Sequence, residues 1–296
     1  MSDSPRERML AAYRGVFSDV VPVAPEFWYY VPARLLGLPM YEFELEVPHW
    51  QALQHTFKHY QTEGWGIVAP ESTGGSGINE RSVTRRLDDE RLEVVRTIEG
   101  EGRVLTSRTR MDAVEPSWLV ERYIKDFDVD WPVYAASALQ PAAELDWRPV
   151  QHALDTVGED YLLEVFVGFP FIDFAGGQRE GGLEQVIMDL LDREDYMLEM
   201  QQRHIQHVVE MIHAVFTRTT AQSVFIASSW SSMSLLSPAL WRKWEKPLLS
   251  AAVQAAHAHG GLCIIIFMGD AWQFSKSLRT WDWIASARLS VLRVVM

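Results

Sequence analysis

Short apolar segments alternate with long helical patterns through the second half of the chain. The apolar segments are YLLEVFVGFPF, SVFIASS and LCIIIF, and helical patterns such as YMLEMQQRHIQHVVEMIHAVFTRT lie between them. Strands that alternate with helices of this length form βα units around a parallel sheet, and several successive units favour a barrel. We therefore predict an α/β fold, a TIM (β/α)8-type barrel in a single domain spanning residues 1–296. Its functional loops should follow the strands, after Val68, Val167, Ile226 and Phe267.

The first half of the chain carries two other patterns. Apolar residues recur at helical spacing over 5–16 and 48–62, which predicts an N-terminal helical lead-in. Between Asn79 and Asp112, three runs rich in Val, Thr and Ile are separated by the turn signals DDE and GEG. This second pattern predicts an antiparallel hairpin insert.

Composition narrows the class of protein. The chain has 296 residues, 48% of them hydrophobic, which is ample for a large core. The charged start MSDSPRERML and the lack of any run of about 18 apolar residues predict a cytoplasmic protein that does not enter a membrane. The only cysteine, Cys263, excludes an internal disulfide and fits a reducing compartment. A net charge of −13 argues against nucleic acid as a partner.

Two carboxylates stand where strands of the predicted barrel should end. They are Glu71 in IVAPES and Asp173 in FPFIDF. Barrels present catalytic acids and bases from these positions, so we predict both as catalytic residues that bind or protonate a substrate. Each could equally cap the following helix or simply be solvated. The chain also has 12 Trp and 13 Phe, which either fill the core or line a pocket for a flat organic ligand. We include Trp28 and Phe171 among the predicted substrate-binding residues.

Established catalytic motifs are absent from the sequence. It contains no GxxxxGK[ST], no GxGxxG after a strand, no HExxH, no GxSxG and no paired CxxC. TGGSG at 73–77 and GGQREGG at 176–182 are rich in glycine, but neither leads into the lysine that a phosphate loop needs. Flexible loops are the simpler interpretation of both.

The segment SVFIASSWSSMSLLSPALWRKWEKPLLSAAVQAAHAHGG resembles the uroporphyrinogen decarboxylase superfamily. Further segments agree in order, namely RERMLAAYRG with VVPV, GLPMYEF, GFPFIDFAGG with GGLEQVIMDLLDR, and GDAWQF. The resemblance covers nearly the whole chain, and LSPALWRKWEKP is its most specific part. It implies a TIM barrel whose pocket lies at the carboxyl ends of the strands, without an organic cofactor.

The decarboxylases of this superfamily hold an aspartate after an early strand, where it binds the pyrrole NH groups; by resemblance Glu71 takes that place. A second motif, similar to FDSWAG, corresponds to ASSWSS, so Ser228 replaces an aspartate and Trp230 is kept. The arginine-rich stretch that binds the substrate's carboxylates reads WYYVPARLLGLP here, which leaves Arg34 alone. We list Arg34, Ser228 and Trp230 as substrate-binding by resemblance.

A second branch of the superfamily comprises corrinoid-linked methyltransferases. These carry His-x-Cys after the sixth strand as zinc ligands, whereas this chain has Ile266 and Met268 at those positions. We therefore expect no metal site. The resemblance implies metal-independent acid/base decarboxylation of a tetrapyrrole or related small-molecule substrate. The alternatives are a cobalamin-linked methyltransferase or demethylase, acting on a methylated or methoxylated compound with a corrinoid protein as partner, and an inactive remnant that binds a tetrapyrrole.

The C-terminal segment departs from the family pattern. A barrel of this superfamily continues past GDAWQF with a helix, two strands and an acidic, Pro-rich loop, whereas this chain reads RTWDWIASARLSVLRVVM. One choice of codons for this segment, read two bases later, gives DLGLDCICPLERPPGGD, which is similar to the family's continuation. We expect residues 279–296 to be a non-native tail, produced by a single-base shift near Leu278, and the barrel to be incomplete at its C-terminal end.

Overall fold

A four-stranded parallel sheet forms the centre of the molecule. The computed structural model describes residues 3–16, 20–73, 77–232 and 234–268. The sheet has the order β1-β8-β9-β10, and every neighbouring pair is parallel. Its strands are β1 (Trp65–Val68), β8 (Leu162–Gly168), β9 (Ser223–Ser228) and β10 (Leu262–Phe267).

Helices cover the outer face of this sheet. They are α6 (Arg148–Val157), α9 (Glu194–Arg218) and α11 (Lys246–Ala258). Alternate strand residues such as Val165 and Ile226 pack with Val215 and Ala252 of these helices in the largest hydrophobic cluster. Because side chains alternate along a strand, the intervening residues form the inner face of the sheet.

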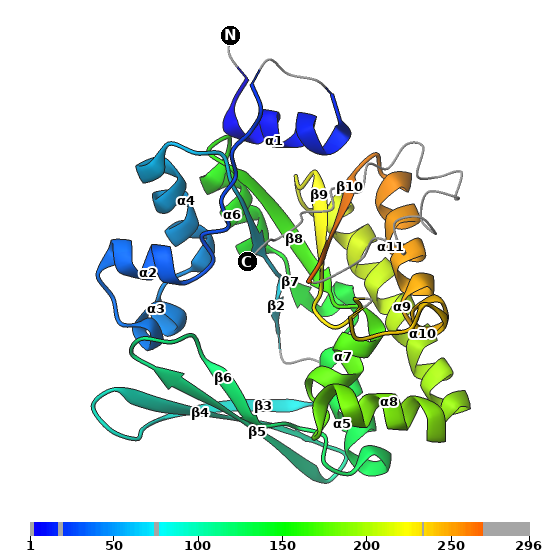
Figure 1. Ribbon diagram of the computed structural model, residues 1–296. Coiled ribbons are helices and arrows are strands. Elements are labelled where there is room, and N and C mark those ends of the chain that lie inside the picture. Colours follow the sequence, from blue (N-terminus) through cyan, green and yellow to red (C-terminus); the bar gives the residue numbers. More distant parts are fainter. Residues whose placement is uncertain (1–2, 17–19, 74–76, 233, 269–296) are drawn as a thin grey trace.

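One end of the inner face of the sheet is covered by α1 (Pro5–Arg14). This helix begins with a capping box formed by Ser4 and Glu7. Met9 and Tyr13 of this helix pack with Trp65, Leu162 and Phe225 of the strands. The helix therefore covers one end of the inner face, near the amino ends of the strands (Figure 1).

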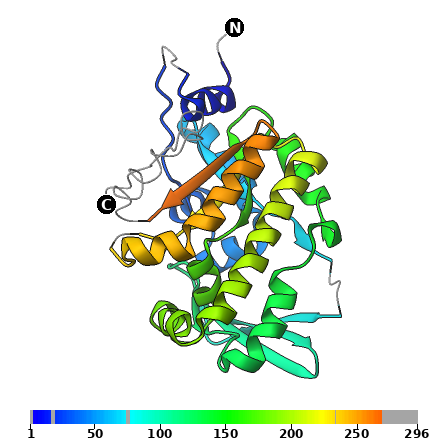
Figure 2. The ribbon, with the colours of Figure 1, turned by 90° about the vertical axis from the view of Figure 1, so that its right-hand side faces the viewer.

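An antiparallel sheet lies beyond the carboxyl ends of the parallel strands (Figures 1 and 2). Its order is β3-β4-β5-β6, from β3 (Asn79–Arg86), β4 (Arg91–Gly100), β5 (Arg103–Asp112) and β6 (Trp118–Glu121). One face packs on α3 (Met40–Glu46) through Tyr41 and on α5 (Phe127–Ala138) through Val133. We call it the lid sheet. The predicted hairpin insert is confirmed, with β6 as an additional strand.

The remaining elements connect these parts. They are α2 (Tyr30–Leu36), α4 (His49–Tyr60), β2 (Glu71–Ser72), the 3-10 helix η1 (Ala142–Glu144), β7 (Leu145–Asp146), α7 (Phe171–Gly177), α8 (Gly182–Asp192) and α10 (Pro238–Trp244). The predicted helical lead-in is confirmed by α1 and α4. No helix of the described ranges has the length and apolar character needed to span a bilayer.

The predicted α/β class is confirmed, and each of the four predicted functional loops follows a strand of the parallel sheet. Four parallel strands lie within the described residues, so a closed eight-stranded barrel stays a prediction. The segment GDAWQF and the expected non-native tail at 279–296 lie outside the described residues.

Candidate functional site

The candidate site lies where β8 and β9 end, on the side that faces the lid sheet (Figure 1). The chain leaves β8 through Gly168, whose φ of 135° favours glycine, and enters α7 after Pro170. It leaves β9 through Ser229, Trp230 and Ser231. Loops from two neighbouring parallel strands are thereby brought together at one edge of the sheet.

Asp173, in the first turn of α7, joins these two loops. Its Oδ1 accepts hydrogen bonds from the backbone N–H groups of Ser229 and Trp230, each at 2.9 Å, and its Oδ2 accepts one from the Ser231 hydroxyl at 3.3 Å. The residue is 8% exposed. The structure therefore places this predicted catalytic carboxylate on α7, just after β8, where it is nearly buried and both of its oxygens accept hydrogen bonds.

Glu245, at the junction of α10 and α11, is a second carboxylate that our sequence reasoning missed. Its two oxygens accept hydrogen bonds from the backbone N–H groups of Phe171 at 2.9 Å and Ile172 at 2.8 Å. These are the first N–H groups of α7, which have no partner inside the helix and favour a negative charge. A lone glutamate in the Trp-rich segment LWRKWEKP was the only signal for it in the sequence.

The two carboxylates are electrostatically coupled. Burial raises the pKa of Asp173 to about 6, although the hydrogen bonds from Trp230, Ser229 and Ser231 oppose this shift. Burial also raises the pKa of Glu245 to about 8, and the negative charge of Asp173 adds to the shift. Because like charges at close range do not ionise together easily, the pair retains a proton at neutral pH. This arrangement can donate a proton without a metal ion.

Trp230 and Ser228 lie beside this pair. The Trp230 ring packs so closely on α7 that a Cβ added at Gly176 would lie 2.7 Å from it. Ser228 is 1% exposed, and its hydroxyl has no hydrogen-bond partner in the described part of the chain. Two residues predicted by resemblance are thus brought to the end of β9, next to Asp173.

Trp28 begins a row of aromatic rings along the inner face of the sheet. Its ring centroid lies 5.7 Å from that of Trp65, which stacks on Phe225 at 5.4 Å. Phe166 continues the row 6.5 Å from Phe225, and Phe169 follows it at 5.0 Å, at the carboxyl end of β8. Trp65 and Phe225 are buried against α1, so most of this row belongs to the core. Its last ring, Phe169, is 39% exposed and reaches the candidate site.

The other predicted residues are placed differently. The Phe171 side chain is 0% exposed and stacks on Trp244, so Phe171 contributes its backbone N–H to Glu245 rather than a pocket wall. Glu71 is exposed on β2, which pairs with β7. Arg34 is exposed on α2. The structure therefore brings neither Glu71 nor Arg34 into the Asp173 network.

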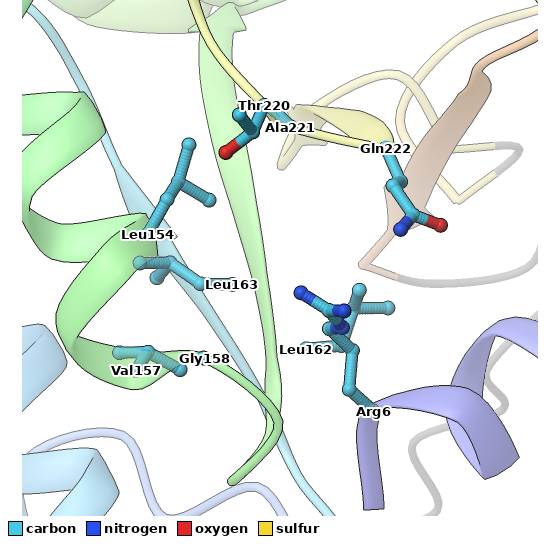
Figure 3. A pocket seen from close by; sticks show the side chains of 9 residues that line it. All are labelled: Arg6, Leu154, Val157, Gly158, Leu162, Leu163, Thr220, Ala221 and Gln222. Carbon is cyan, nitrogen blue, oxygen red and sulfur yellow. The ribbon is translucent and has the colours of Figure 1, made fainter. Parts of the chain in front are cut away.

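A small cavity lies at the opposite end of the parallel sheet, near the amino ends of β8 and β9 (Figure 3). It is lined by Arg6, Leu154, Val157, Gly158, Leu162, Leu163, Thr220, Ala221 and Gln222. Because α/β enzymes react at the carboxyl ends of their strands, this cavity is not the candidate site. Within the described ranges, no group of three or more His, Cys, Asp or Glu side chains is arranged to hold a metal ion.

Comparisons with known proteins give a family and a fold. Residues 149–291 match the family described as uroporphyrinogen decarboxylase (URO-D), so the match includes α6 to β10 and runs into the expected tail. Among solved structures, a methyltransferase from Methanosarcina mazei has a TM-score of 0.53 at 14% sequence identity, covering 90% of this chain and 71% of that one. A search of the curated proteins found no match. At this identity the likeness shows the fold alone.

Proposed function

We propose that this chain, of which residues 149–291 match the uroporphyrinogen decarboxylase family, is an enzyme that decarboxylates a tetrapyrrole or a related organic acid. In this proposal the parallel sheet is the first part of a TIM barrel, and the substrate binds at its carboxyl ends. The observation that carries the proposal is the buried pair of Asp173 and Glu245 at the loops after β8 and β9.

The proposed chemistry is the transfer of one proton. When the bond between the substrate carbon and its carboxylate breaks, CO2 leaves, and the electron pair that stays on the carbon must be neutralised by a proton. Asp173, with its pKa raised to about 6, is the group that supplies it. Glu245, with its pKa raised to about 8, holds a proton at neutral pH and passes it to Asp173 after the transfer. The Ser231 hydroxyl lies close to both carboxyl groups. Phe169, 39% exposed at the carboxyl end of β8, offers an aromatic ring for apolar contact with the substrate.

The test is loss of carboxyl groups from uroporphyrinogen. The full chain is incubated with this substrate without oxygen, and the oxidised products are separated by their number of carboxyl groups. Asp173→Asn should lower kcat by about 10²- to 10⁴-fold, the usual contribution of a positioned acid. Gln178→Ala is a matched control, because Gln178 follows α7 but makes no contact with the Asp173 network among the described residues.

Two results would contradict this function. One is a wild-type protein that folds and releases no product. The other is an Asp173→Asn variant that keeps the wild-type rate. Binding of uroporphyrin without any turnover would instead favour an inactive remnant that only binds a tetrapyrrole.

A cobalamin-linked methyl transfer is the second candidate, and the shared fold with a methyltransferase favours it. The residues at the zinc-ligand positions of that branch do not fit zinc. Ile266 has no donor atom and packs in the apolar cluster of the inner face, and Met268 offers only a thioether. The test mixes the chain with methylcobalamin and a thiol and follows the spectrum of the corrinoid. Conversion to the demethylated form would favour methyl transfer over decarboxylation.

A further inference from the structure

The lid sheet turns one of its faces toward the rest of the molecule. This inner face of the lid carries Leu92 and Val94, which pack near Tyr41 of α3, and Ile98, which packs on Val133 of α5. Since side chains alternate along a strand, Arg96 of β4 shares this face with Val94 and Ile98. Arg96 therefore stands on the face that α3 and α5 cover, between the two apolar clusters.

Hydroxyl groups flank Arg96 on both neighbouring strands. The register pairs Ser82 of β3 with Arg96, and Arg96 with Ser107 of β5. The next row toward α3 pairs Thr84, Val94 and Thr109. The middle of the inner face of the lid thus carries Arg96 among hydroxyl groups. The row of Ile98 adds Glu80 at its β3 end, and the row of Leu92 adds Arg86.

Arg96 is exposed, and among the described residues it has no salt-bridge partner. This differs from Arg108 and Arg110 on the opposite face of the lid, which pair with Glu93. A guanidinium with free donors beside two hydroxyls matches the geometry of a carboxylate.

Aromatic rings connect Arg96 with the candidate site. Tyr123 packs against the cluster of Ile98 and Val133, and Ile98 lies two residues from Arg96 on the same face of β4. The Tyr123 ring stacks on Tyr134 at 6.0 Å, and Tyr134 lies 6.0 Å from Phe174. Phe174 follows Asp173 on α7. Packed rings thus connect the part of the lid sheet that carries Arg96 with α7, the helix that carries Asp173.

We propose that Arg96, flanked by Ser82 and Ser107, binds a carboxylate of the substrate and holds it under the lid sheet. This inference rests on the proposed function, because it assigns a carboxylated substrate to the same site. It also supplies a cation that Arg34, exposed on α2, does not bring to the Asp173 network. Arg96 is then a residue that determines specificity for acidic substrates.

The experiment measures binding rather than turnover. Uroporphyrin, a stable porphyrin with carboxylate side chains, is titrated into the full chain, and its dissociation constant is obtained from quenching of tryptophan fluorescence. Arg96→Gln should weaken binding by about tenfold to a hundredfold, the usual effect of losing charge-assisted hydrogen bonds. Arg96→Lys should give an intermediate loss, because the charge stays while the forked donors are lost.

Arg81→Gln is the matched control. Arg81 is exposed on β3 and pairs in register with Thr97, so it lies on the opposite face of the lid. Its substitution removes the same charge from the same sheet and should change the dissociation constant by less than about twofold. Circular dichroism of each variant checks that the fold is kept, and if Arg96→Gln does not fold, Arg96→Lys carries the test.

The outcomes separate this inference from the proposed function. Equal binding by wild type and Arg96→Gln, equal losses in Arg96→Gln and Arg81→Gln, or no binding by the wild type would each overturn the role of Arg96. A selective loss in Arg96→Gln supports it even if uroporphyrinogen is not turned over, in which case only the proposed decarboxylation fails. If uroporphyrinogen is turned over but Arg96→Gln binds uroporphyrin as tightly as wild type does, the proposed decarboxylation stands and the role of Arg96 fails.

Discussion

Glu164 should make the stability of this protein fall as the pH rises. It lies on β8, it is 0% exposed, and neither of its carboxylate oxygens has a hydrogen-bond partner in the described part of the chain. Burial raises its pKa well above the ordinary value of 4.5, and the neighbouring Ser223 only partly opposes this. The folded protein therefore keeps the proton on Glu164 to a higher pH than the unfolded chain does.

The sign and size of the effect follow from this proton. A folded-state pKa that is raised gives stability that is fully present below the unfolded pKa and is lost as the pH rises toward the folded pKa. Each pH unit in that window costs about 1.4 kcal/mol. Above the unfolded pKa the free energy of unfolding should therefore fall by up to about 1.4 kcal/mol per pH unit on account of Glu164, until the pH reaches its folded pKa. Glu164→Gln has nearly the same shape and no titrating proton, so it should lack this fall.

The assay is urea unfolding of both proteins at pH 5, 6 and 7, followed by tryptophan fluorescence. Asp173 and Glu245 also titrate, but they do so in both proteins and cancel in the difference. The stability of Glu164→Gln relative to wild type should increase from pH 5 to pH 7, by up to about 1.4 kcal/mol for each pH unit. Glu71→Gln, the same substitution at an exposed position, is the control. A difference between Glu164→Gln and wild type that is the same at all three pH values would refute the reasoning.

Two further predictions concern the candidate site. Glu71 lies outside the Asp173 network but follows β1, and the role that the sequence assigns to it predicts that Glu71→Ala abolishes turnover of uroporphyrinogen. The melting temperature should not change, because Glu71 is exposed, and unchanged turnover would show that it is not catalytic. Gly176→Ala should lower the free energy of unfolding by about 1–3 kcal/mol, since its Cβ would lie 2.7 Å from Trp230 and 2.9 Å from Val186. Gly177→Ala is its control, with no atom within 4 Å of the added Cβ, and equal melting temperatures for both variants would exclude the predicted clash.

Local patterns in the sequence predicted most of the elements, because their causes are local. The apolar runs that end near Val167, Ile226 and Phe267 are the strands of the parallel sheet, since a strand buried on both faces must be apolar along its length. The runs between Asn79 and Asp112 form the lid sheet, because residues such as Val, Thr and Ile favour strands and turn signals separate the runs. Ser237 and Pro238 begin α10, with the Ser237 hydroxyl accepting a hydrogen bond from the Leu240 N–H.

The candidate site was only partly predictable. Asp173 was found because it follows a strand, and the fold of βα units makes such positions meet. Its partner Glu245 lies 72 residues later in the sequence, at a junction between two helices. No spacing rule links these two residues, because their proximity depends on how α7 and α10 pack against each other.

The sequence by itself determined the class of fold, the order of its strands and helices, and the resemblance to a family, since these follow from periodicity and short motifs. The tertiary structure alone decided which carboxylates are buried together, that the oxygens of Glu164 find no hydrogen-bond partner among the described residues, and that Arg96 faces inward from the lid. Charges on distant segments acquire their pKa values and partners only when packing removes water around them. For that reason the chemistry of this protein is decided by its packing, although its architecture can be predicted from the chain.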